Sequence, residues 1–230
     1  MKEVQDHWFK LAKDEGYRSR AAYKLLEIDE RKHVLRRGDR VLDAGAAPGS
    51  WAQVAADRIG LKGVVYAVDL KPIDPNGFPP NVKRLHADLR DISLDDVGGK
   101  PFDVILSDMA PNTTGDPGGD HFQSVRLCNE LIDRCGTWLR RGGHLVMKVF
   151  EGQEYPVLLK RCVRLFDEAK GFKPKASRAE SVEMFIVCHR YGGPRPERTP
   201  AEQSFLPKRK PSTGWKTPDT GLPTDDDNDN

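Results

Sequence analysis

The feature that most constrains this chain is a glycine turn between a short apolar strand and a helix. Val41-Leu42-Asp43 leads into Gly45-Ala46-Ala47-Pro48-Gly49, and a helix is expected from Ser50 to Arg58. Because glycine has no Cβ, the backbone of such a turn can bend sharply and lie against a bound molecule. The two glycines are four residues apart and do not match G-x-G-x-x-G, the turn that accommodates a dinucleotide pyrophosphate. The turn therefore predicts a nucleotide-type cofactor other than NAD.

Apolar runs alternate with helical patterns along the rest of the chain. Nearly continuous apolar strands that alternate with helices are typical of a parallel sheet covered on both faces, since each parallel return needs a crossover. We therefore predict a doubly wound α/β fold. The expected strands are Arg40–Ala44, Gly63–Asp69, Val82–Ala87, Phe102–Ser107, Gly143–Phe150 and Met184–His189, and further helices are expected at Phe122–Leu139 and Tyr155–Glu168.

An acidic residue stands at the end of each of four successive expected strands: Asp43, Asp69, Asp88 and Asp108. A single aspartate at such a place is often the N-cap of the next helix. The carboxyl ends of parallel strands, however, meet at one edge of the sheet, where the ligands of such folds bind. Asp69 follows the glycine turn by about twenty residues, where an acid can accept hydrogen bonds from both ribose hydroxyls of an adenosine cofactor.

The sequence singles out two lysines to different degrees. Lys148 lies inside the apolar run Leu145–Phe150, and a lysine buried in a strand needs an acidic partner or a function. Asp108 could be that partner; alternatively, Lys148 could lie on an edge strand and extend its ammonium to solvent. Lys24 lies in a helical stretch expected from Arg18 to Arg31, and its pattern alone is that of a solvated lysine.

The C-terminal part of the chain differs in composition from the rest. From Gly192 onward it holds seven of the seventeen prolines, a basic Lys208-Arg209-Lys210 cluster and an acidic end. Such a segment buries too little apolar surface to fold. We therefore expect a folded domain over residues 1–192 and a disordered Pro/Asp-rich tail over residues 193–230. No run approaches eighteen apolar residues and no signal-peptide core follows Met1, so we expect a cytoplasmic protein without a membrane contact.

The cysteines and the charge carry less information. Cys128, Cys135, Cys162 and Cys188 form no C-x-x-C pair and have no histidine at metal-ligand spacing, so we expect buried free thiols and no metal site. The net charge is +2, and several basic residues, among them Arg18 and Arg20, precede the first strand. They fit a solvated helix face as well as an RNA-binding surface.

Five motifs follow one another along the chain: Arg18-Ser19-Arg20-Ala21-Ala22-Tyr23-Lys24-Leu25, Leu42-Asp43-Ala44-Gly45-Ala46-Ala47-Pro48-Gly49-Ser50-Trp51, Ser107-Asp108-Met109-Ala110-Pro111-Asn112, Met147-Lys148-Val149-Phe150 and Ser177-Arg178-Ala179-Glu180-Ser181-Val182-Glu183. In this order they resemble the FtsJ/RlmE family of ribosomal RNA 2′-O-methyltransferases, and the resemblance extends from about residue 7 to residue 190. It implies a Rossmann-like S-adenosylmethionine methyltransferase fold. In that fold a seven-stranded, mostly parallel sheet has helices on both faces, and a last hairpin brings in an antiparallel strand.

The resemblance also implies roles for single residues. The family's catalytic tetrad carries over to Lys24, Asp108, Lys148 and Glu183, and its contacts with S-adenosylmethionine carry over to Gly49, Trp51, Asp69, Asp88 and Asp108. The implied reaction is 2′-O-methylation of a ribose in large-subunit ribosomal RNA, at a uridine of the A-loop, by a monomer that acts on the large ribosomal subunit. Ser50 and Phe185 depart from the pattern, since many relatives have glycine and tyrosine there.

Three other functions fit the sequence less well. The glycine spacing argues against an NAD-dependent oxidoreductase. A non-catalytic RNA-binding or ribosome-assembly factor would not need Lys148. Methyltransferases that act on the ribose of transfer RNA or messenger RNA share the tetrad, but the small single-domain build favours ribosomal RNA.

Overall fold

The computed structural model of the chain describes residues 2–177 and 181–194, so the expected tail lies almost wholly outside it, and its disorder stays a prediction. The elements run in the order α1 (Lys2–Asp14), α2 (Ala22–Lys32), β1 (Arg40–Ala44), α3 (Ser50–Ile59), β2 (Val64–Asp69), β3 (Val82–His86), the 3₁₀ turn η1 (Asp95–Val97), β4 (Phe102–Ser107), α4 (Pro117–Trp138), β5 (Leu139–Phe150), α5 (Tyr155–Leu165), β6 (Phe166–Phe172) and β7 (Glu183–Tyr191).

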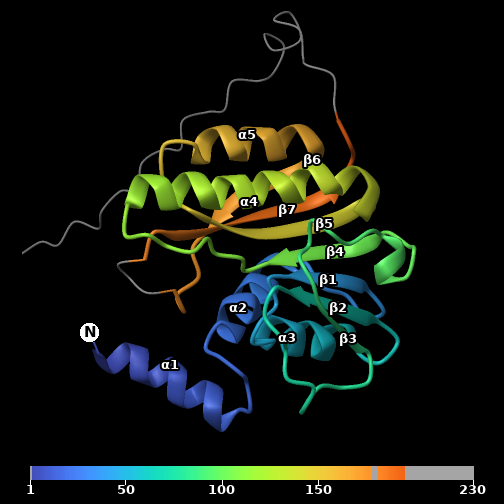
Figure 1. The fold of residues 1–230 in the computed structure, drawn as a ribbon, viewed down its shortest axis with the longest axis vertical. Coiled ribbons are helices and arrows are strands. Elements are labelled where there is room, and N and C mark those ends of the chain that lie inside the picture. Colours follow the sequence, from blue (N-terminus) through green and yellow to red (C-terminus); the bar gives the residue numbers. More distant parts are fainter. Residues whose placement is uncertain (1, 178–180, 195–230) are drawn as a thin grey trace, which may run out of the picture. The chain divides into compact units, whose positions relative to one another are not determined.

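The strands described form one seven-stranded sheet in the order β3-β2-β1-β4-β5-β7-β6 (Figure 1). Strands β1 to β5 pair in parallel, whereas β7 is antiparallel to both β5 and β6. The predicted α/β class, the seven strands and the antiparallel last hairpin are thereby confirmed. The order of the parallel strands reverses between β1 and β4, so a ligand is expected at the carboxyl ends of these two strands.

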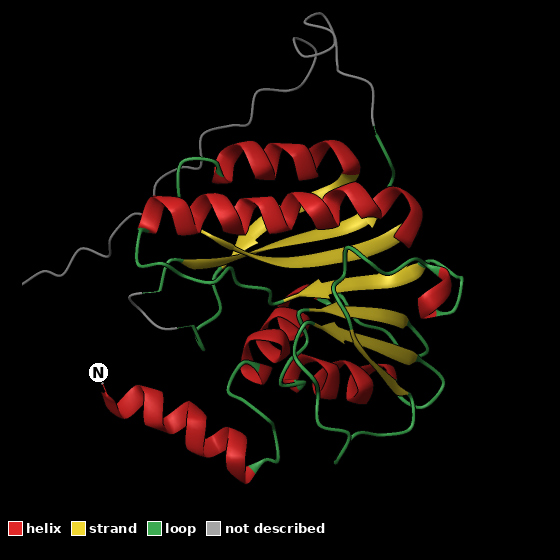
Figure 2. Ribbon diagram, in the orientation of Figure 1, coloured by secondary structure: helices red, strands yellow, loops and turns green. Residues whose placement is uncertain are grey.

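Helices cover both faces of the sheet, as Figures 1 and 2 show. On one face, α4 and α5 bury residues such as Leu131 and Cys162 in the same cluster as Leu42 of β1. On the other face, α2 and α3 bury Ile28 and Trp51 in a cluster with Val41. Neighbouring residues of β1 thus enter opposite cores, because successive side chains of a strand point to opposite faces.

All four cysteines are free and buried, which confirms their interpretation as packed thiols. Among the described residues, no helix has the length and apolar character needed to cross a membrane.

Some elements differ from the sequence-based prediction. The helix expected to reach Glu168 ends at Leu165, and β6 begins at the next residue without a turn. β6 is an edge strand in which Phe166 and Ala169 are the buried residues. An edge strand with so few buried positions shows neither the alternation nor the apolar run by which strands are recognised. Helix α1, at the N-terminus, was not predicted at all.

Two histidines face each other across the β5–β7 pair. The Nδ1 atoms of His144 and His189 lie 3.2 Å apart, and His144 is buried. Burial lowers the pKa of His144 to about 4, helped by the charges of His189 and nearby arginines, including Arg190. Burial also lowers the pKa of His189, against the opposing effect of Glu168. Both rings are therefore neutral in the folded protein at neutral pH.

We expect the free energy of unfolding to decrease as the pH falls from about 6.5 toward 5. In that window the unfolded chain protonates His144 while the folded chain does not, so acid favours unfolding. Urea denaturation at about pH 6.5 and pH 5 measures this decrease for the wild type and for His144→Gln. The decrease should be smaller in the variant by about 1–2 kcal/mol, after allowance for solvent screening. The same pH dependence in the variant and the wild type would contradict the prediction.

Candidate active site

Two lysines and two carboxylates form a ring of alternating charge at the carboxyl edge of the sheet. The Lys148 Nζ lies 3.0 Å from Asp108 Oδ1 and 3.6 Å from Glu183 Oε1. The Lys24 Nζ lies 3.0 Å from Glu183 Oε2 and 4.0 Å from Asp108 Oδ1. Each ammonium therefore faces both carboxylates. The structure thus brings together the four residues that the family resemblance singled out. They come from four elements: α2, the end of β4, β5 and β7.

Strand register explains why three of these side chains meet. Ser107 pairs with Met147 in the parallel β4–β5 ladder, so Asp108 follows beside Lys148. In the antiparallel β5–β7 ladder Lys148 pairs with Phe185, which makes Glu183 a diagonal neighbour on the same face. The Lys148 Nζ also donates a hydrogen bond to the backbone oxygen of Asp108 at 2.7 Å. β5 has neighbours on both sides, so the edge-strand interpretation of Lys148 is wrong.

Lys24 is not the solvated lysine that its local pattern indicates. Its side chain is 8% exposed, and its Nζ lies 5.7 Å from the centre of the Phe185 ring. The turn before α2 is held by Trp51, whose Nε1 donates to the carbonyl of Ala21 at 2.8 Å. The sequence predicted a helix that begins at Arg18, but helix α2 begins at Ala22. Tertiary packing thus directs Lys24 toward Asp108 and Glu183. A helical pattern in the sequence does not reveal such packing.

The ring keeps Glu183 ionised. Burial raises the pKa of Glu183, but Lys24 and Lys148 lower it more, and the net direction is downward. Four mutually paired charges with no net charge can remain at low exposure, because each buried ion keeps a partner. The arrangement places the Lys148 amine at the carboxyl edge of the sheet, with Asp108 and Glu183 ready to stabilise the ammonium that forms if it accepts a proton.

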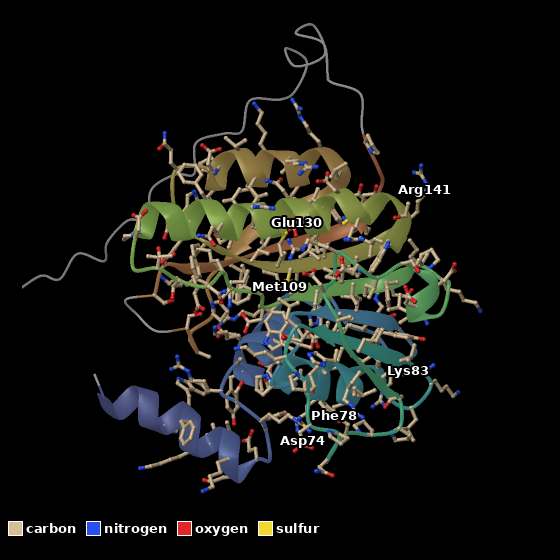
Figure 3. All side chains as sticks on the ribbon, viewed as in Figure 1. Asp74, Phe78, Lys83, Met109, Glu130 and Arg141 are labelled. Atoms are coloured by element: carbon tan, nitrogen blue, oxygen red, sulfur yellow. The ribbon has the colours of Figure 1, made fainter. Side chains whose placement is uncertain are left out.

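The glycine turn Gly45–Gly49, called the glycine loop from here on, lies against two other segments. Gly45 and Gly49 have φ angles of 76° and 109°, in the region that favours glycine. A Cβ at Gly45 would come within 3.0 Å of Met109 Cγ, and one at Gly49 would lie 2.5 Å from Phe78 Cζ. Figure 3 labels both neighbours, Phe78 on the connection from β2 to β3 and Met109 after β4. The sequence predicted the sharp bend but not these two residues, since single apolar loop residues form no pattern.

The four strand-end acids do meet at one edge, because β3, β2, β1 and β4 are parallel neighbours. Asp69 already accepts hydrogen bonds from the backbone N–H groups of Ala47 (2.8 Å) and Lys71 (2.7 Å). It therefore ties the glycine loop to β2, and its oxygens keep further lone pairs for a ligand. Asp88 is paired with Arg90, whose hydrogen bonds lower the pKa of Asp88 to about 2.

Asp43 lies beneath the glycine loop with no exposed surface. Neither carboxylate oxygen has a hydrogen-bond partner among the described residues. Burial raises the pKa of Asp43 well above its usual range, and the nearby carboxylates of Asp108 and Asp69 raise it further. Carboxyl groups gathered at this edge fit a cofactor that is cationic and carries ribose hydroxyls, as S-adenosylmethionine does.

The start of α3 can hold the acidic end of such a cofactor. Gln53 is the first residue whose amide bonds back to Gly49, at 3.0 Å. The preceding amides, including that of Trp51, have no partner within the helix and can bind an anion. The Trp51 ring itself is buried and packs 5.6 Å from Phe185, so a cofactor contact of Trp51 has to come from its backbone.

Gly45→Ala should weaken binding of S-adenosylmethionine and slow methyl transfer, each by about tenfold or more. The new Cβ displaces Met109 and, with it, the neighbouring Asp108. Gly16→Ala is the matched control, because Gly16 has a similar φ of 77° and nothing within 4 Å of the added carbon. Both variants should lose about 1–2 kcal/mol of stability from backbone strain, and only Gly45→Ala should lose cofactor affinity in calorimetry. Equal affinities would show that the loop adapts.

Comparison with known proteins places the chain in a family. The family model "FtsJ-like methyltransferase" matches residues 17–191. "Ribosomal RNA large subunit methyltransferase E" of Nitratidesulfovibrio vulgaris (strain DP4) is 45% identical over 202 residues, which cover 84% of this chain and 96% of that protein. The protein of the same name from Syntrophobacter fumaroxidans is 45% identical over 187 residues, which cover 80% of this chain and 94% of the relative.

A solved structure agrees with these relatives. A crystal structure described as a ribosomal RNA methyltransferase from Plasmodium falciparum matches with a TM-score of 0.67 and 30% identity, over 77% of this chain and 100% of that one. Methyltransferases of this family use S-adenosylmethionine, so the cofactor predicted from the sequence is confirmed. The chain belongs to the FtsJ-like methyltransferase family.

Proposed function

We propose that this protein transfers the methyl group of S-adenosylmethionine to a ribose 2′-oxygen of large-subunit ribosomal RNA. The observation that carries the proposal is the charge ring around Lys148, which lies at the same sheet edge as the glycine loop. The names of the relatives support ribosomal RNA of the large subunit as the substrate. The resemblance favours a uridine of the A-loop as the nucleotide.

The chemistry requires a base and accurate placement. S-adenosylmethionine supplies a methyl group on a sulfonium, which is reactive enough for positioning to provide much of the rate. A ribose hydroxyl is a weak nucleophile until it loses its proton. Lys148 in its neutral form accepts that proton at Nζ. The ammonium that results is stabilised by Asp108 and Glu183, at 3.0 Å and 3.6 Å from Nζ.

Lys24 and Glu183 orient the base. Glu183 bridges the two lysines, and Lys24 fixes Glu183 at 3.0 Å. The positive charge of Lys24 also favours the neutral form of its neighbour, since like charges disfavour ionisation. Lys24 and the two carboxylates thus have opposite electrostatic effects on the Lys148 ammonium.

The cofactor contacts follow from the geometry of the loop. Gly49 and Trp51 offer backbone amides at the start of α3, and Asp69 offers its remaining lone pairs to the ribose hydroxyls. Asp88 is assigned to the cofactor as an ionised carboxylate held in place by Arg90. Asp108 lies between the cofactor side and the base. These roles remain part of the proposal, as do a monomeric state and a cytoplasmic location.

The substrate test compares large ribosomal subunits, taken from a strain that lacks the gene, with deproteinised RNA from the same particles. With a net charge of +2, the protein has little electrostatic affinity for free RNA. Recognition then depends on the fixed shape of a folded particle, which presents an unpaired nucleotide. Labelled cofactor should modify one ribose, at a faster initial rate on subunits than on naked RNA over a range of salt.

Faster methylation of naked RNA, or of transfer RNA, would make a transfer-RNA or messenger-RNA substrate the better assignment. Label on a base instead of a ribose would contradict the proposed 2′-O chemistry.

Lys148→Ala should reduce methyl transfer by about 10² to 10⁴, the usual contribution of a general base. Cofactor affinity should stay within a few-fold, because the proposal places Lys148 at the reacting hydroxyl. Lys83→Ala, an exposed lysine on the far edge strand β3, is the control that should leave both quantities unchanged. Single-turnover rates and calorimetry supply the measurements. A Lys148→Ala rate within about tenfold of the wild-type rate would remove Lys148 from the base role.

A further inference from the structure

Arg18 connects three segments around the glycine loop. Its Nη1 donates to the carbonyl of Pro48 at 2.9 Å, and its Nη2 donates to the carbonyl of Asn76. Its backbone N–H donates to Gln53 Oε1 at 2.9 Å. One residue thereby holds the turn before α2, the glycine loop with the start of α3, and the connection between β2 and β3.

Phe78 completes this arrangement from the other side. The Arg18 guanidinium lies over the Phe78 ring, 4.0 Å from its centre. The same ring lies against the loop backbone, because a Cβ at Gly49 would fall 2.5 Å from Phe78 Cζ and 3.3 Å from Arg18 Cδ. Phe78 and Asp74 share the β2–β3 connection, as Figure 3 shows. Asp69, at the end of β2, is where this connection begins.

These contacts leave Arg18 poorly placed for the RNA contact that its position in the sequence allowed. Two backbone carbonyls and an aromatic face already occupy its guanidinium. The planar fork can bridge two carbonyls and stack at once, which a lysine ammonium cannot do.

We propose that Arg18 and Phe78 form a clasp that closes the β2–β3 connection over the glycine loop, and that Arg18 is a positioning residue for S-adenosylmethionine. The inference rests on the proposed function, because it assigns the loop to that cofactor. The clasp orders Gly49 and Asp69 together, so its loss lowers cofactor affinity without touching the base.

The test measures S-adenosylmethionine binding by calorimetry and methyl-transfer kinetics for Arg18→Ala, Arg18→Lys and Phe78→Ala. Arg18→Ala should weaken cofactor binding by at least about tenfold, since charge-assisted hydrogen bonds are lost. KM for the cofactor should rise in step, while kcat at saturating cofactor and KM for RNA should stay within a few-fold of wild type. Arg18→Lys should restore little, and the double variant Arg18→Ala/Phe78→Ala should lose less than the product of the single losses.

Arg126→Ala is the matched control, because Arg126 is an exposed arginine with an i,i+4 partner on α4. It should leave cofactor affinity unchanged. Unchanged cofactor affinity in Arg18→Ala, or a raised KM for RNA with a reduced salt dependence that Arg18→Lys restores, would overturn the clasp and make Arg18 a phosphate contact. Failure of the wild-type protein to bind S-adenosylmethionine would instead overturn the proposed function, so the two failures are distinguishable.

Discussion

The alternating ion pairs of the four-residue ring are the interaction on which the rest of the site depends. Lys24 and Lys148 have side chains only 8% and 6% exposed, and each lies between the same two carboxylates. Removing one member of such a buried set leaves an unpaired charge, at a cost of about 3–5 kcal/mol. The same balance that makes the ring stable holds Lys148 in one position. Stability and proton transfer therefore depend on the same contacts.

The backbone around the ring determines where the cofactor lies relative to the base. Gly45 lets Met109 approach the glycine loop, and Met109 follows Asp108 directly in the chain. Asp69 fixes the other side of the loop through the Ala47 amide. Single residues thus connect the glycine loop to the charge ring. A change in packing at the loop would displace Asp108 and, through it, Lys148.

Much of this could be predicted from the sequence, for different physical reasons. The parallel strands β1, β2 and β4 are almost entirely buried, so their apolar runs identified them, and with them the sheet edge where the acids meet. Lys148 was predicted because a lysine inside such a run needs a partner. Lys24 was recognisable only by family resemblance, since its partner Glu183 is distant in sequence. Strand β6 and the contacts of Phe78 were missed, because an exposed edge and a loop aromatic leave no periodic signal.

The most direct test of the ring is the single-turnover rate of methyl transfer as a function of pH, for wild type, Glu183→Gln and Lys24→Met. The account predicts that the rate rises with pH as Lys148 loses its proton. The midpoint of the rise should shift to lower pH in Glu183→Gln, which loses a carboxylate beside the ammonium, and to higher pH in Lys24→Met, which loses a like charge. A rate independent of pH, or midpoints that do not move, would contradict it.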